Sequence, residues 1–82
     1  MDVTVARIGR AHGLRGDVVL DIRTDDPAAR LAPGMVLRTE PAELGPLTID
    51  RVRNDSGRWY AAFVGHTDRT AAEALRGVAL VV

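Results

Sequence analysis

The sequence predicts an all-β fold, a small six-stranded antiparallel barrel with one short helix before the last strand. Three observations support this prediction. Apolar and polar residues alternate along most of the chain, as they do in half-buried strands. Glycine, proline, asparagine and aspartate interrupt the alternation at short intervals, as turns require. The chain has only 82 residues, and an open sheet of that size would leave apolar edges exposed, which closure into a barrel avoids.

The first two strands follow from this alternation. The side chains of residues 3–8 should point alternately to the two sides of the chain, which predicts the first strand. From Asp17, the sequence DVVLDIRT places Val18, Leu20 and Ile22 on one face, which predicts the second strand. Between them lies IGRAHGLRGDV, whose three glycines alternate with basic residues. We expect a loop there, because glycine permits a positive φ or the close approach of another backbone.

A short helical turn and a third strand come next. Asp26 precedes Pro27, which is typical of a helix N-cap followed by proline at the first helical position, and the turn should run through Leu31. Pro33 and Gly34 end it and lead into the strand MVLRT. The following segment, EPAELGPL, contains two prolines and a glycine and predicts a loop.

A β-hairpin is the clearest local signal in the chain. The strands LTIDRVR and RWYAAFVG are joined by four turn-forming residues, Asn54–Gly57. On the second strand, Trp59, Ala61 and Phe63 share one face. We interpret them as core residues; the alternative is a platform on which nucleic-acid bases stack.

The last segment, HTDRTAAEALRGVALVV, predicts a two-turn helix and a final strand over Val78–Val82. Thr70 and Glu73 fit a capping box, in which each side chain binds the backbone N–H of the other residue. Gly77 stands where a left-handed residue would end the helix. The helix should dock on the sheet through a narrow apolar stripe, namely Ala71, Ala74 and Leu75. The sequence stops within the last strand, so we expect these residues to form an N-terminal domain of a longer protein.

Composition excludes several classes of protein. There are no cysteines, so disulfides and thiolate metal sites are ruled out, which suits a reducing cytosol. No apolar run reaches the length of a membrane span, and the N-terminus does not resemble a signal peptide. The 11 basic and 11 acidic residues balance, which argues against nonspecific nucleic-acid binding. Every basic residue is arginine, which indicates either codon bias or recognition of carboxylates and phosphates.

The glycine-rich segment does not fit a nucleotide-binding loop. A Walker loop needs a lysine, and the chain has none; a dinucleotide fingerprint needs different glycine spacing and a helix after it. His12 and His66 are the only histidines, too few for a metal site with scattered aspartates. The single serine, Ser56, lies in a predicted turn, so no nucleophilic triad is apparent. We therefore expect neither catalytic activity nor a metal or cofactor.

Binding remains as the function of this segment. Arginines and a histidine cluster around it and form a local positive patch on a neutral chain. Either it is a solvated loop whose arginines balance nearby acids, or it is a shaped protrusion that contacts a protein or RNA. On the second interpretation, the glycines at 9, 13 and 16 shape the loop. The partner-binding residues are then Arg7, Arg10, His12, Gly13, Leu14 and Arg15.

The segments VARIGRAHGLRGDVVL, TDDPAARLAPGMVL and GHTDRTAAEALRGVALVV resemble the N-terminal domain of the ribosome maturation factor RimM, over nearly the whole chain. Two motifs are specific. In the first, Gly9, Arg10, His12, Gly13, Leu14, Arg15 and Gly16 match the family. In the second, Asp68, Arg69, Ala72, Glu73, Leu75 and Gly77 match.

The resemblance implies a bacterial, cytoplasmic assembly chaperone that is not an enzyme and needs no cofactor. It would act on the head of the small ribosomal subunit, bind the small-subunit ribosomal protein numbered nineteen, and assist maturation of ribosomal RNA. The implied fold is a six-stranded barrel like those of translation factors, with a C-terminal PRC barrel following it in the natural protein. We expect a monomer. The alternative function is direct RNA binding by the barrel.

Overall fold

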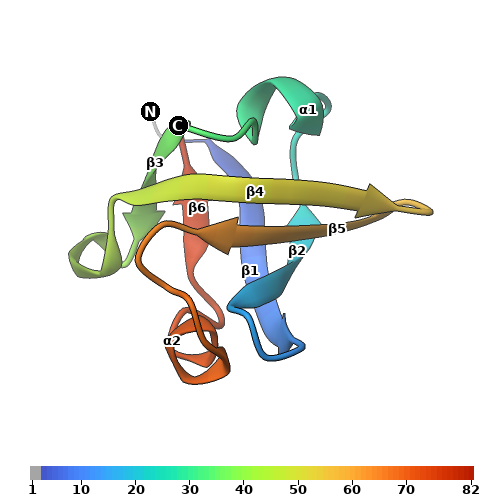
Figure 1. The fold of residues 1–82 in the computed structure, drawn as a ribbon. Helices are drawn as coiled ribbons and strands as arrows, with labels where there is room; N and C mark the ends of the chain where they lie inside the picture. Colours follow the sequence, from blue (N-terminus) through green and yellow to red (C-terminus); the bar gives the residue numbers. More distant parts are fainter. Residues whose placement is uncertain (1–2) are drawn as a thin grey trace.

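A computed structural model describes residues 3–82, which form a closed antiparallel barrel with two short α-helices and one 3₁₀ helix (Figure 1). The strands follow the barrel in the order β1-β2-β5-β4-β3-β6. Within the described residues this confirms the predicted six-stranded barrel. The elements are β1 Thr4–His12, β2 Asp17–Ile22, α1 Pro27–Arg30, β3 Val36–Glu40, η1 Ala42–Leu44, β4 Leu47–Asp55, β5 Arg58–Phe63, α2 Arg69–Glu73 and β6 Ala79–Val81.

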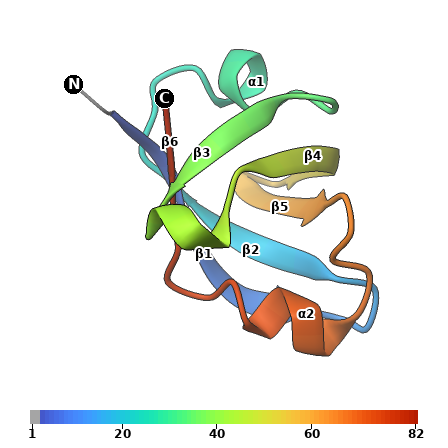
Figure 2. The same cartoon turned by 90° about the vertical axis from the view of Figure 1, so that its left-hand side faces the viewer.

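The two α-helices cover opposite ends of the barrel (Figure 2). α1 forms as expected, since the Asp26 side chain accepts a hydrogen bond from the Ala29 backbone N–H and Pro27 opens the helix. α2 lies at the other end, beside the turn that joins β1 to β2. Both helices are too short to cross a lipid bilayer.

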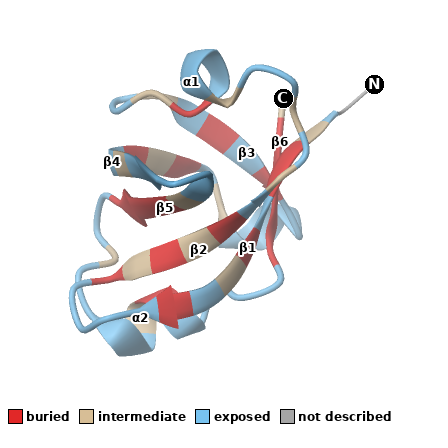
Figure 3. Cartoon of the chain, turned by 90° about the vertical axis from the view of Figure 1, so that its right-hand side faces the viewer, coloured by how far each residue is buried: buried red, intermediate tan, exposed pale blue. Residues whose placement is uncertain are grey.

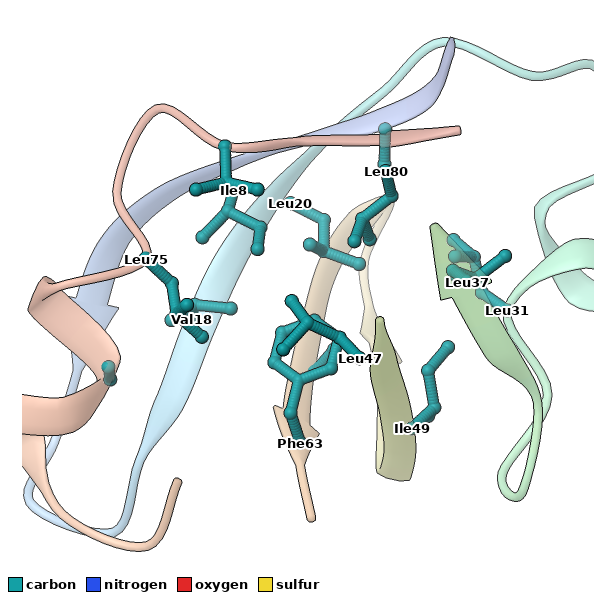
Figure 4. Packing of buried hydrophobic residues seen from close by; sticks show 14 of the residues in the cluster. Ile8, Val18, Leu20, Leu31, Leu37, Leu47, Ile49, Phe63, Leu75 and Leu80 are labelled. Atoms are coloured by element: carbon teal, nitrogen blue, oxygen red, sulfur yellow. The ribbon is translucent and has the colours of Figure 1, made fainter. Parts of the chain in front are cut away.

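The barrel interior is filled by side chains from every strand, together with Leu31 and Leu75 from the segments next to the helices (Figure 4). Buried and partly exposed residues alternate along β2, where Val18 and Leu20 are buried (Figure 3). Phe63 is the largest fully buried side chain, with 1% of its surface exposed. Phe63 and Ala61 lie in the core and Trp59 packs against it, which confirms their interpretation as core residues.

β1 is longer than predicted, because it continues through a bulge. Ile8 pairs with Leu20 and Ala11 with Val18, so Gly9 and Arg10 together oppose Val19. An added residue of this kind bends a strand without ending it. Gly9 suits the bulge, since a Cβ there would lie 3.1 Å from the Val19 carbonyl oxygen. Its assignment to the loop was therefore wrong: Gly9 shapes the strand, and the loop is confined to residues 13–16.

The β4–β5 turn is shorter than predicted. Asp55 pairs with Arg58, so the turn consists of Ser56 and Gly57 alone. Both have positive φ, 54° and 87°, as a type I′ turn requires. The Asn54 side-chain oxygen accepts a hydrogen bond from the Gly57 N–H at 3.0 Å. Asn54 and Asp55 extend β4 because this two-residue turn matches the twist of the paired strands.

The capping of α2 differs from the prediction. Asp68, not Thr70, is the N-cap, and its Oδ1 accepts a hydrogen bond from the Ala71 N–H at 2.8 Å. Glu73 is not part of a capping box but accepts a hydrogen bond from Arg69 Nε. The buried face also differs from the predicted stripe, since Ala72 and Leu75 are buried while Ala74 is exposed. The prediction that Gly77 ends the helix was wrong: α2 ends at Glu73 with Ala74 as its C-cap, and Gly77, with φ 88°, lies four residues later in the turns that lead to β6.

Because Asp68 caps α2, Asp68→Ala should lower the free energy of unfolding by about 1 kcal/mol. Thr70→Ala is the matched control and should change it by less than about 0.5 kcal/mol, since Thr70 is exposed and does not cap the helix. Urea unfolding followed by Trp59 fluorescence measures both values. A larger loss in the Thr70 variant would restore the original capping assignment.

Candidate partner-binding surface

The predicted binding loop is a tight turn between β1 and β2. His12 pairs with Asp17 across its base, and residues 13–16 form the turn. Gly13 and Gly16 both have positive φ, 76° and 86°, a conformation that other residues rarely adopt. These two glycines therefore supply the backbone conformation of this turn.

Three residues, Arg69, His66 and Arg51, hold the loop against the rest of the barrel. On the side of α2, Arg69 Nη1 donates a hydrogen bond to the Gly13 carbonyl at 3.3 Å. Gly16 is buried against the backbone of His66, so closely that a Cβ would overlap the His66 carbonyl oxygen. On the side of β4, Arg51 Nη2 bonds Asp17 Oδ1 at 2.8 Å and the Arg15 carbonyl at 3.4 Å. The loop is thus held from both sides.

A stack of three side chains lies at the base of the loop. The rings of His12 and Tyr60 are 4.7 Å apart between centroids, and the Arg53 guanidinium lies 4.5 Å from the centre of the Tyr60 ring. Tyr60 is on the outer face of β5 yet only 8% exposed. The stack joins the loop to β5 and β4, so β1, β4 and β5 all contribute to one surface.

Leu14 and Arg15 project from this loop. Leu14 is 77% exposed, the highest value among the large apolar side chains of the described residues. Arg15 is also exposed, and within residues 3–82 its side chain forms no ion pair. An exposed leucine on a loop held in one conformation is typical of a contact surface, because a rigid anchor loses little entropy when it binds.

The structure brings together some of the predicted binding residues and separates others. His12, Gly13, Leu14 and Arg15 line one hollow, together with Asp17 and Arg53. Arg7 does not take part, since its Nη1 donates to the Gly77 carbonyl at 2.8 Å, next to β6. Arg10 is exposed in the bulge, outside the lining of the hollow. Among residues 3–82, no three histidine, aspartate or glutamate side chains are placed to hold a metal ion.

Sequence reasoning missed the residues that other strands bring to this surface. Sequence reasoning did not single out Arg51, Arg53 or Tyr60, and it identified Arg69 only as part of the family motif, without a role at this surface. Arg51 and Arg53 pair with Ala62 and Tyr60 across the hairpin, and the alternation of arginine with valine in RVR is the one local signal that places both on the outer face.

The family model for the RimM N-terminal domain matches residues 3–82. The chain belongs to the RimM N-terminal domain family. It is 56% identical over 81 residues to the ribosome maturation factor RimM of Streptomyces coelicolor, covering 99% of this chain and 43% of the relative. It is 52% identical over 82 residues to that of Kineococcus radiotolerans, covering all of this chain and 47% of the relative. The chain therefore spans about half the length of these RimM relatives.

Two solved structures share the fold. The crystal structure of a RimM protein from Pseudomonas aeruginosa, described as a 16S ribosomal RNA processing protein, matches the whole chain and half of that protein with a TM-score of 0.80 at 23% identity. The solution structure of the N-terminal domain of RimM from Thermus thermophilus matches 99% of this chain and 87% of that domain, with a TM-score of 0.74 at 25% identity. Both likenesses support the RimM barrel.

Proposed function

We propose that this domain acts in assembly of the small ribosomal subunit, as a cytoplasmic binding module without catalytic activity. Its partner is the small-subunit head protein numbered nineteen, and binding assists maturation of ribosomal RNA. The relatives it matches are ribosome maturation factors.

The observation that supports this proposal is the exposure of Leu14 on a loop held by the rest of the barrel. A leucine that is 77% exposed gains stability only when a partner covers it. The arginines around it supply charge-assisted hydrogen bonds at the rim of the contact. Tightly held apolar anchors surrounded by polar groups are the usual centres of protein interfaces.

The test is a binding measurement with the purified ribosomal protein, in which Leu14→Ala is compared with Val36→Ala. Val36 is 60% exposed on β3, outside the proposed surface. Truncating a central anchor costs more than about 1 kcal/mol, so we expect Leu14→Ala to weaken binding about tenfold and Val36→Ala to leave it unchanged. Equal effects of the two substitutions would contradict the assignment of the surface.

Salt dependence separates this function from the alternative, direct RNA binding. The affinity of an RNA-binding domain falls steeply with ionic strength, because each phosphate contact releases counterions. We expect a shallow dependence for the protein complex. The neutral charge of the chain favours the protein partner.

A further inference from the structure

A hollow lies between the β1–β2 loop and β4. Its volume is about 360 Å³, and it is lined by His12, Gly13, Leu14, Arg15, Asp17 and Arg53.

The lining of this hollow offers donors and few free acceptors. The carbonyl oxygens of Gly13 and Arg15 already accept hydrogen bonds from Arg69 and Arg51, respectively. The Asp17 carboxylate is engaged by Arg51 at 2.8 Å. In contrast, neither Arg15 nor Arg53 has a carboxylate partner among residues 3–82. The ligand that complements such a lining is an anion.

Arg53 is prepared for this contact. Its guanidinium lies 4.5 Å from the centre of the Tyr60 ring. Stacking uses the flat face of a guanidinium and leaves its N–H edge available for a carboxylate. Because the Tyr60 ring packs against His12 and is only 8% exposed, it gives the exposed Arg53 guanidinium a buried surface to lie on.

The same surface favours a carboxylate of a protein over an RNA phosphate. Leu14 forms an apolar wall, which suits a side chain and not a ribose-phosphate chain. Tyr60 is 8% exposed, so it offers no open ring on which a base could stack.

We propose that this hollow recognises an acidic residue of the protein partner, with its carboxylate between Arg15 and Arg53 and an adjacent apolar side chain against Leu14. The identity of the partner rests on the proposed function. The new element is the chemistry that the partner must present to this hollow. Paired guanidiniums hold a carboxylate by charge-assisted hydrogen bonds, and the apolar wall selects its neighbour.

The experiment is an NMR titration of the isotope-labelled chain with a blocked tripeptide, acetyl-Leu-Glu-Leu-amide. The controls are acetyl-Leu-Gln-Leu-amide and a uridine hexanucleotide. We expect the glutamate peptide to shift the amide resonances of residues 13–17 and the Arg53 Nε–H, at a peptide concentration about tenfold lower than the glutamine peptide needs. Equal shifts with the glutamine peptide, or larger ones with the RNA, would overturn the proposal.

Substitutions provide the second arm of this test. Arg53→Gln and Arg15→Gln should each weaken binding of the glutamate peptide about tenfold. Arg58→Gln is the matched control, because Arg58 is exposed on β5 and does not line the hollow. Arg15 makes no side-chain hydrogen bond within residues 3–82, so its loss leaves the fold intact. The proposal fails if the Arg58 variant is weakened as much as the other two.

The two proposals fail separately. If the peptide binds as described and the ribosomal protein does not, the proposed partner is wrong and the acidic recognition stands. If the ribosomal protein binds through Leu14 but the peptide produces no shifts at Arg15 and Arg53, the carboxylate site is wrong and the proposed function stands.

Discussion

Gly16→Ala is expected to lower the free energy of unfolding by about 3 kcal/mol, a large fraction of the stability of so small a domain. Two costs add at this position. The φ of 86° is unfavourable for any residue with a Cβ. In addition, the new methyl group would overlap the carbonyl oxygen of His66, so the β1–β2 loop and the segment after β5 must separate. Urea unfolding followed by circular dichroism measures the loss.

Gly13→Ala is the matched control for this substitution. Gly13 lies in the same turn with a φ of 76°, but a Cβ there meets no atom within 4 Å. Only the backbone cost applies, about 1 kcal/mol. If both variants lose the same stability, the contact between Gly16 and His66 does not hold the loop in place. If Gly16→Ala loses at least twice as much stability as Gly13→Ala, the larger part of the Gly16→Ala loss comes from that contact.

The barrel could be predicted from the sequence because its strands have recognisable local patterns of side chains. Val18 and Leu20 alternate with less buried positions, and the β4–β5 turn contains residues that favour positive φ. In so short a chain, closing the sheet into a barrel is one of the few ways to cover the apolar faces and edges of these strands. The length of β1 could not be predicted, because the bulge at Gly9 and Arg10 breaks the period of two on which strand assignment depends.

The helix cap shows where local sequence leaves a choice open. Asp68 and Thr70 are both good N-cap residues, two positions apart, and each predicts a different start for α2. Tertiary packing decides between them. Starting at Arg69 buries Ala72 and Leu75 against the barrel and lets Arg69 reach the Gly13 carbonyl.

The candidate site was predictable only where it is continuous in sequence. His12, Gly13, Leu14 and Arg15 are neighbours, so one motif identified them. The residues that hold this loop lie far away in the sequence. Arg51 is 36 residues from Arg15, to which it donates a hydrogen bond, and Arg69 is 56 residues from Gly13, to which it donates another. Closure of the barrel brings these residues to the loop, and no local sequence pattern indicates which strands become neighbours.

Phe63→Ala should cost the largest amount of stability, about 3–5 kcal/mol. The Phe63 ring is 1% exposed inside the barrel, so its removal leaves a cavity in the core. A chain of this size has roughly 4–12 kcal/mol of stability in total, and about a quarter or more of it would be lost. Val64→Ala is the control, since Val64 is the next residue along the chain but 58% exposed; its effect should stay below about 0.5 kcal/mol. Thermal unfolding compares the two.

This core substitution also separates stability from recognition. Phe63 points into the barrel, whereas Tyr60, His12 and Arg53 form their stack on the outer face. Under conditions where Phe63→Ala is still folded, its affinity for the ribosomal protein should equal that of the wild type once corrected for the folded fraction. Leu14→Ala should show the reverse, with weaker binding at unchanged stability. A loss of intrinsic affinity in the Phe63 variant would mean that the binding surface depends on core packing and is not fixed by its own contacts.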